Sequence, residues 1–217
     1  MRIDKDSYGT LAIVYAICLA VVALMLLFCH NPYVKYPVLL FCLVFVGWQT
    51  AFFRIPVRQK CGSSTLVSSV ADGKVVILQN EYEKEFLKCD TRKISVFMDF
   101  FDVHANYWPV SGVVTYYKYH PGKHFLAFLP KASEDNEHSC ICIRTDEGKD
   151  VFFKQLAGTF ARRIVCYAKV GDRVVAGEQC GIIKFGSRID MYLPLDAKIN
   201  VTLGEQTRAC ETIMAEI

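Results

Sequence analysis

Several features that define common classes of protein are missing from this sequence. No long basic block is interleaved with aromatic residues and the net charge is only +3, which disfavours nucleic acid as a partner. No Cys-x-x-Cys pair is present. Cys140 and Cys142 are two residues apart, which puts both on the same face of a strand and does not match a zinc motif, so we predict no structural metal. No G-x-S-x-G motif occurs, which disfavours a hydrolase with a standing serine nucleophile.

The chain after residue 65 also lacks a convincing amphipathic helix of ten or more residues, and it has no heptads. Short runs of strand-forming residues with glycine punctuation are present instead, which predicts a mainly β fold. The expected strands are 66–70, 74–79, 93–98, 112–119, 124–129, 140–145, 150–156, 161–167, 179–185, 190–193 and 198–203.

Long apolar runs are what the N-terminal part does have. Hydrophobic residues make up 53% of the chain and charged residues 22%. Two runs predict a transmembrane helical hairpin, with helices at about 10–29 and 37–53 joined by a turn around Pro32. The second run is marginal in length, so a half-inserted or re-entrant helix is the alternative for it. Because no small-x-small cleavage site follows the first run, we expect it to be retained and not removed as a signal peptide.

The flanking charges indicate how this hairpin is oriented. Arg2 and Lys5 precede it and Arg54, Arg58 and Lys60 follow it, whereas the turn carries only Lys35. This bias predicts that both ends lie in the cytoplasm. Residues 1–58 are therefore expected to form a membrane anchor and residues 59–217 a separate β domain, and the ten cysteines are expected to be reduced.

An internal repeat refines the expected fold. Residues 170–178 and 203–211 match at an offset of 33, each with a glycine followed by an acidic residue. The pattern resembles the hammerhead repeat of lipoyl and biotinyl carrier domains, which implies a barrel-sandwich-hybrid-like β domain. Those carriers need an exposed lysine where this chain has Phe185-Gly186-Ser187, so carrier function is disfavoured.

Several collinear motifs over residues 52–217 resemble those of a known enzyme family. They are Phe52-Phe53-Arg54-Ile55-Pro56, Ala71-Asp72-Gly73-Lys74-Val75, Phe101-Asp102-Val103-His104, Pro121-Gly122-Lys123, Pro130-Lys131-Ala132, Arg162-Arg163-Ile164-Val165-Cys166-Tyr167 and Phe185-Gly186-Ser187-Arg188-Ile189-Asp190. Together they are similar to the small bacterial and archaeal (type A) class of phosphatidylserine decarboxylases.

The resemblance implies a self-processing proenzyme. Gly186 and Ser187 match the family's cleavage pair, where the serine becomes a pyruvoyl group and the chain divides into non-covalently held pieces, 1–186 and 187–217. The pyruvoyl ketone then forms a Schiff base with phosphatidylserine, and phosphatidylethanolamine and carbon dioxide are released. The implied setting is a bacterial cell membrane, with the catalytic domain on the cytoplasmic side.

The resemblance also implies two assisting residues. Asp72 matches an aspartate thought to orient a histidine during self-cleavage, and His104 matches a histidine linked to catalysis. Larger members have a second histidine three residues after the first, where this chain has Tyr107. The group that activates Ser187 therefore stays open: it is either His104 or another residue.

Three arginines are candidates for binding the lipid phosphate, because guanidinium pairs with that group bidentately. They are Arg162, Arg163 and Arg188. Adjacent strand residues face opposite sides, so at most one of Arg162 and Arg163 is expected to do so. His120, Lys123 and His124 are expected in a loop near the membrane face, and 131–138 in a polar surface loop.

A second function remains open at this stage: a membrane-anchored hybrid-motif adaptor without catalytic activity. It would need a coiled-coil hairpin between two half-motifs and would have no use for the Gly186-Ser187 pair. The sequence leaves the exact lipid preference and the oligomeric state undetermined.

Overall fold

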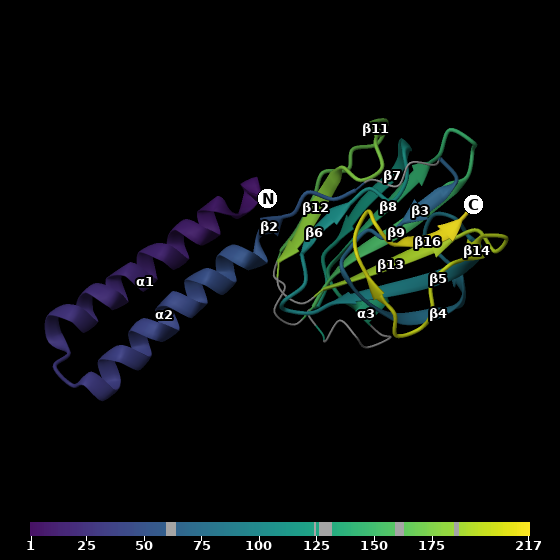
Figure 1. Cartoon of the computed structure of the whole chain (residues 1–217). Coiled ribbons are helices and arrows are strands. Elements are labelled where there is room, and N and C mark those ends of the chain that lie inside the picture. Colours follow the sequence, from purple (N-terminus) through teal and green to yellow (C-terminus); the bar gives the residue numbers. More distant parts are fainter. Residues whose placement is uncertain (60–63, 124, 126–131, 159–162, 185–186) are drawn as a thin grey trace. The chain divides into compact units, whose positions relative to one another are not determined.

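The computed structural model describes every residue except 60–63, 124, 126–131, 159–162 and 185–186 (Figure 1). The chain divides into two compact units, Met1–Pro56 and Val57–Ile217. Each unit is described by itself.

The first unit is a pair of apolar helices. α1 (Tyr8–Phe28) follows a short 3-10 helix, η1 (Lys5–Ser7), and α2 (Pro32–Phe52) runs back. Both helices are long and apolar enough to cross a membrane. β1 (Arg2–Ile3) pairs antiparallel with β2 (Arg54–Ile55), so the two ends of the hairpin meet.

The turn between the helices is shorter than the sequence suggested, because α2 begins five residues earlier than expected, at Pro32 rather than residue 37. Pro32 occupies the first helical turn, where the N–H that proline lacks would have no partner anyway. Asn31 caps this end: its side-chain oxygen accepts a hydrogen bond from the Tyr33 N–H at 3.0 Å.

The second unit is mainly β, as predicted. Its largest described sheet has eight antiparallel strands and curls over the core. In spatial order they are β11 (Arg173–Val174), β7 (Gly112–His120), β8 (His138–Arg144), β9 (Asp150–Ala157), β13 (Ser187–Leu193), β5 (Cys89–Met98), β4 (Gly73–Glu83) and β15 (Gln206–Thr207).

Two three-stranded sheets complete the described β structure. One has the order β10 (Arg163–Cys166), β12 (Gln179–Lys184) and β6 (Ala105–Tyr107). The other has the order β14 (Lys198–Ile199), β16 (Ile213–Glu216) and β3 (Leu66–Ser68). The strand expected at 124–129 falls almost entirely outside the described residues.

The eight-stranded sheet has two distinct faces. Its inner face carries apolar residues such as Ile94, Phe153 and Ile189, which join residues of both smaller sheets in one hydrophobic core. Its outer face carries a separate small cluster: Cys140, Cys142, Phe152 and Tyr192. Because side chains alternate along a strand, neighbouring residues of β13 belong to different faces.

The sequence repeat is also a structural repeat. Gly171 and Gly204 both have positive φ, 92° and 88°, and their N–H groups donate to the Val114 and Val75 carbonyls at 2.8 Å. The later positions Gly177 and Cys210 match in the same way, with φ of 76° and 67°. The two halves therefore dock onto β7 and β4 with the same hydrogen-bond pattern.

The polar segment 131–138 is not the surface loop that we expected. It contains the short helix α3 (Ala132–Asp135), and Ser133 and Asn136 are only 4% and 0% exposed. The burial is tolerated because both side chains are hydrogen-bonded: Asn136 Nδ2 donates to the Ala157 carbonyl at 2.8 Å, and Ser133 joins a charged network.

Candidate active site

Ser187 is the first residue of β13, which lies between β5 and β9 in the middle of the large sheet. It stands in register with Met98 on one side and Ala157 on the other. Its side chain is fully buried, and Oγ donates to Met98 Sδ at 3.8 Å. Ser187 therefore faces the inner side of the sheet.

Two buried amide side chains share this inner region with Ser187. Asn106 of β6 donates from Nδ2 to the same Met98 sulfur at 3.8 Å, and its Oδ1 accepts from Gln155 Nε2 at 2.8 Å. Asn106 and Gln155 are each 0% exposed. Ser187 thus belongs to a small polar group enclosed between two sheets, where donors have little competition from water.

His104 lies on the segment that leads into the same group. It immediately precedes β6, and its carbonyl accepts from the Ile183 N–H at 3.3 Å, four residues before Ser187. The imidazole is fully buried, and Nδ1 lies 3.0 Å from the Asp102 carbonyl. That carbonyl can only accept, so it favours a proton on Nδ1 and leaves Nε2 as the basic nitrogen. The two-residue spacing to Asn106 places both on one face of this extended segment.

Asp72 has a structural role that repeats elsewhere in the domain. It forms an ion pair with Arg58, and its Oδ1 accepts from the Ala209 N–H at 2.8 Å. Ser111 does the same in the other half: its hydroxyl accepts from the Ala176 N–H at 2.9 Å, 33 residues earlier than Ala209. Asp72 and Ser111 each lie directly before the glycine that begins a long strand. Each side chain holds a turn of the repeat by accepting a hydrogen bond from its backbone.

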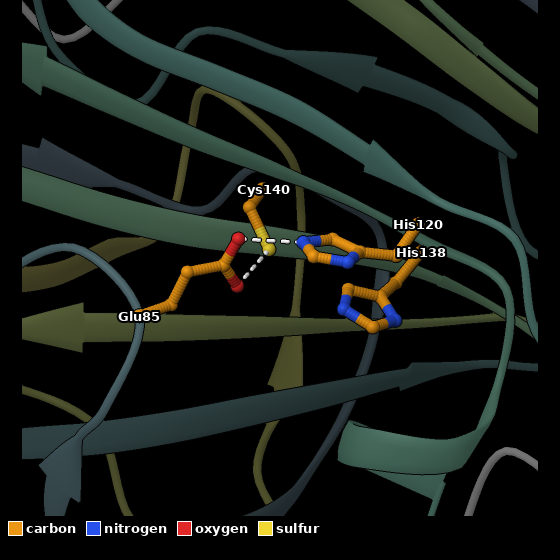
Figure 2. Close-up of side chains that lie close together, drawn as sticks. All are labelled: Glu85, His120, His138 and Cys140. Atoms are coloured by element: carbon orange, nitrogen blue, oxygen red, sulfur yellow. Dashed lines mark hydrogen bonds and ion pairs between the residues drawn. The ribbon is translucent and has the colours of Figure 1, made fainter.

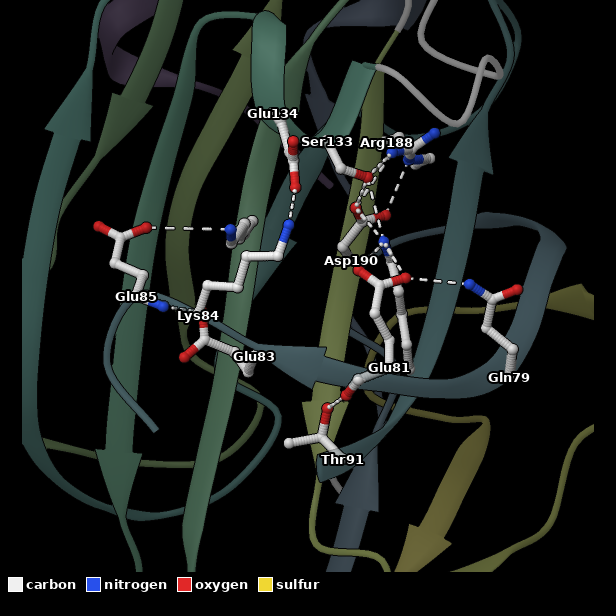
Figure 3. Close-up of polar contacts among 12 residues, drawn as sticks. Gln79, Glu81, Glu83, Lys84, Glu85, Thr91, Ser133, Glu134, Arg188 and Asp190 are labelled. Carbon is white, nitrogen blue, oxygen red and sulfur yellow. Dashed lines mark hydrogen bonds and ion pairs between the residues drawn. The ribbon is translucent and has the colours of Figure 1, made fainter. Parts of the chain in front are cut away.

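Arg188 points to the outer side of the sheet, away from Ser187. It is fully buried and binds Asp190 through Nε at 2.7 Å and a terminal nitrogen at 3.0 Å. Figure 3 shows Ser133 beside this pair, and its hydroxyl donates to Asp190 Oδ2 at 2.7 Å. Lys93 completes the network, with Nζ 3.6 Å from Asp190 Oδ2 and 2.9 Å from Glu81 Oε1.

The charges in this outer network stabilise one another. Burial would raise the pKa of Asp190, but the positive charges of Arg188 and Lys93 and hydrogen bonds lower it overall. Asp190 is therefore a carboxylate in the folded protein. A groove of about 710 Å³ runs over Lys93, Ser133, Glu81 and their neighbours on this side.

Three other predicted site residues lie wholly or partly outside the described part of the chain. Gly186 and Arg162 lie outside the described residues. Arg163 begins β10 in register with Lys184, but its side chain is not described. The structure thus brings Ser187 and the His104 segment together, and puts Asp72 at the repeat turn and Arg188 on the opposite face.

The sequence analysis missed Asn106, Gln155 and Met98. A usable signal exists for Asn106, because it follows His104 at the two-residue spacing of a strand. Gln155 and Met98 carry no such signal, since both lie in long strands whose partners are distant in sequence.

Comparison with known proteins places this arrangement in a family. A model of the family described as phosphatidylserine decarboxylase matches residues 45–215. A phosphatidylserine decarboxylase proenzyme of Amoebophilus asiaticus is 48% identical over 170 residues, 78% of this chain and 76% of the relative. That of Cytophaga hutchinsonii is 38% identical over 217 residues, 100% of this chain and 99% of the relative.

The protein therefore belongs to a class of mainly β decarboxylases whose relatives are named as proenzymes. Specifically, this chain is a member of the phosphatidylserine decarboxylase family.

Proposed function

We propose that this chain converts phosphatidylserine to phosphatidylethanolamine and carbon dioxide after cutting itself between Gly186 and Ser187. Family membership across most of the chain is the observation that carries the proposal, and the buried Ser187, in a motif that resembles the family's cleavage pair, supports it. The same membership disfavours the adaptor alternative, which needs no such serine.

Self-cleavage begins with the Ser187 hydroxyl. Oγ attacks the Gly186 carbonyl carbon, the peptide C–N bond breaks, and an ester links the two residues while the amine becomes free. Elimination then releases the Gly186 carboxylate and leaves dehydroalanine, whose hydrolysis yields ammonia and a pyruvoyl group at residue 187. The polar group around Met98 fits this chemistry, because Asn106 and Gln155 supply amide donors beside the serine.

When present, the pyruvoyl group supplies a carbonyl that accepts the electron pair left by the departing carboxylate. Residues of this chain position the substrate beside this carbonyl and transfer the protons that the reaction needs. His104 Nε2 is suited to move a proton, since its other nitrogen is held at the Asp102 carbonyl. We assign His104 as the base or acid and Asp72 as an assisting residue, and Arg162 or Arg163 as the phosphate contact.

The N-terminal hairpin suits a lipid substrate. Phosphatidylserine stays in the bilayer, so an enzyme anchored there meets the headgroup without extracting the lipid. Two helices of sufficient length and apolarity support this anchoring, and the flanking basic residues favour a cytoplasmic β domain. The paired docking turns of the repeat support a barrel-sandwich-hybrid-like architecture for residues 59–217.

The test is the intact mass of the full chain purified in detergent, with Ser187→Ala as control, followed by an assay on phosphatidylserine in mixed micelles. We expect pieces 1–186 and 187–217, the smaller with a pyruvoyl N-terminus, and release of phosphatidylethanolamine. The control should stay whole and inactive. An uncleaved chain in both samples would overturn the proposal.

A further inference from the structure

Four potential metal-ligating side chains converge on the outer side of the large sheet, away from Ser187. They are Glu85, His120, His138 and Cys140, and their ligand atoms all lie within 4.8 Å of one another. Figure 2 shows the Glu85 carboxylate facing the Cys140 sulfur and the His120 ring, with His138 stacked on His120. We infer that this cluster is a structural site for a divalent transition-metal ion of intermediate Lewis-acid softness, with Zn²⁺ as the best match.

The fold brings the four ligands together from three separate segments. His120 ends β7 and stands directly opposite His138 at the start of β8, and their rings stack at 4.5 Å. Cys140 lies two residues along β8, so it shares a face with His138. Because only one cysteine of the Cys140-x-Cys142 pair takes part, the spacing in the sequence carries no sign of the site.

Glu85 is held in place by its own turn. The Glu83 carboxylate accepts from the backbone N–H groups of Glu85, Phe86 and Leu87 at 2.9, 2.8 and 2.7 Å. Phe86 also stacks on Tyr116 of β7, with ring centroids 4.5 Å apart. The carboxylate is therefore preorganised over the strands, which lowers the cost of gathering ligands around an ion.

The histidine His138 is oriented as a metal ligand requires. Its Nδ1 lies 2.6 Å from the Asn136 carbonyl, which only accepts, so Nδ1 carries the proton and Nε2 keeps its lone pair. A backbone carbonyl behind the second nitrogen is the usual support of a metal-bound imidazole.

Without an ion, the Glu85 carboxylate forms hydrogen bonds with the Cys140 thiol and the His120 ring, whose ligand atoms would bind the ion instead. Its Oε2 accepts from the Cys140 thiol at 3.0 Å, and its Oε1 lies 2.5 Å from His120 Nε2 and accepts from Tyr116 at 2.9 Å. These hydrogen bonds hold the Glu85 carboxylate in the position from which it would bind the ion. On binding, the thiol proton leaves to solvent, and His120 binds as the tautomer with its proton on Nδ1, so that Nε2 presents its lone pair to the ion.

The charges and the access route are compatible with a dication. One thiolate and one carboxylate balance Zn²⁺, while Lys154, 3.8 Å from Glu85 Oε2, remains as a neighbouring cation. Glu85 and His120 are 17% and 27% exposed at a groove of about 260 Å³, whereas Cys140 is fully buried beneath. Zinc bonds of about 2.0–2.3 Å place tetrahedral ligand atoms about 3.3–3.8 Å apart. Ligand atoms as far apart as 4.8 Å must therefore close by roughly 1 Å, whereas the hydrogen-bonded Glu85–His120 and Glu85–Cys140 pairs must open.

The site is expected to be structural. His138 and Arg188 flank Leu156 in register on β8 and β13, two strands apart, and Arg188 faces away from Ser187. An ion bound here would join the 84–88 turn to β7 and β8. It would stabilise the domain without touching the reacting atoms.

The test uses the full chain in detergent, reduced and stripped with chelator, then titrated with Co²⁺ and Zn²⁺. We expect one Co²⁺ per chain with a thiolate-to-cobalt charge-transfer band, loss of that band on adding Zn²⁺, and a higher Tm with Zn²⁺. Cys140→Ser should abolish the band. Cys142→Ser is the matched control, because Cys142 lies on the same strand face but outside the cluster, and it should keep the band.

Two further variants keep the test decisive if Cys140→Ser fails to fold. Glu85→Gln and His138→Gln should each weaken Co²⁺ binding at least about tenfold, the smallest loss seen even for residues one step removed from a metal. Absence of binding, or a band that survives Cys140→Ser, would overturn the inference and leave a hydrogen-bonded cluster. These readouts do not depend on decarboxylase activity or on self-cleavage.

Discussion

Ser187 and Arg188 are adjacent in the chain, yet they lie on opposite faces of β13. Ser187 contacts Met98 in the inner core, and Arg188 binds Asp190 and Ser133 on the outer side. The strand thus separates Ser187, the proposed cleavage residue, from a buried charged network. We expect substitutions in the two layers to have different consequences, for chemistry on the inner side and for stability on the outer side.

The outer network gives the first prediction. Asp190→Asn removes the carboxylate between Arg188 and Lys93 and leaves buried positive charge uncompensated, which should cost about 3–5 kcal/mol in free energy of unfolding. Thermal unfolding of the full chain in detergent measures the change. Asp196→Asn is the control, since Asp196 pairs with Lys149 at the surface and should change Tm little. Equal Tm shifts in both variants would contradict this account.

The same carboxylate predicts an acid dependence. The pKa of Asp190 in the folded protein is lowered from its ordinary 3.8, so its contribution to stability is complete above that value and is lost as pH falls towards the folded pKa. Tm measured from pH 6 downward should therefore fall less steeply below about pH 4 in Asp190→Asn than in the parent chain. Parallel slopes would show that Asp190 does not titrate this way.

Asp72 combines a turn contact with a proposed catalytic role, and substitution can separate them. Ser111 makes the equivalent contact in the other repeat, so Asp72→Ser should keep the turn contact while it removes the ion pair with Arg58. Because the carboxylate is proposed to assist self-cleavage, this variant should cleave itself at least about a hundredfold more slowly, the lower end of general acid–base contributions. Band intensities over time, compared with Ser111→Ala, measure the rate; wild-type cleavage in Asp72→Ser would restrict Asp72 to the turn.

Much of the architecture was predictable because it depends on local pattern. The apolar runs gave the two helices, and the glycine-acidic spacing of Gly171 and Gly204 gave the repeat, whose matching φ values the structure confirms. The polar segment 131–138 was misjudged, since the burial of Ser133 depends on Arg188 and Asp190, more than fifty residues away. Hydrophilic composition cannot reveal such distant partners.

Gly181 gives a prediction about the strand that leads to the serine. A Cβ at this position of β12 would collide with the Val165 carbonyl oxygen and lie 3.0 Å from Gln155 Nε2. Gly181→Ala should therefore destabilise the domain by about 1–3 kcal/mol, the usual cost of overpacking, and disturb the amide beside Ser187. Gly9→Ala is the control, because nothing lies within 4 Å of its Cβ. Unchanged Tm and cleavage in Gly181→Ala would refute the close approach.

The last prediction concerns the piece 187–217 after cleavage. β13 pairs along its whole length with β5 and over six residues with β9, so the piece is held by backbone ladders on both sides. Its Ile189, Met191 and Leu193 are fully buried in the core. Neither hydrogen-bond ladders nor apolar burial is screened by salt. The two pieces should therefore co-elute in detergent at low and high salt and separate only when urea unfolds the domain. Release by salt alone would mean that surface charge, and not the sheet, holds the piece in place.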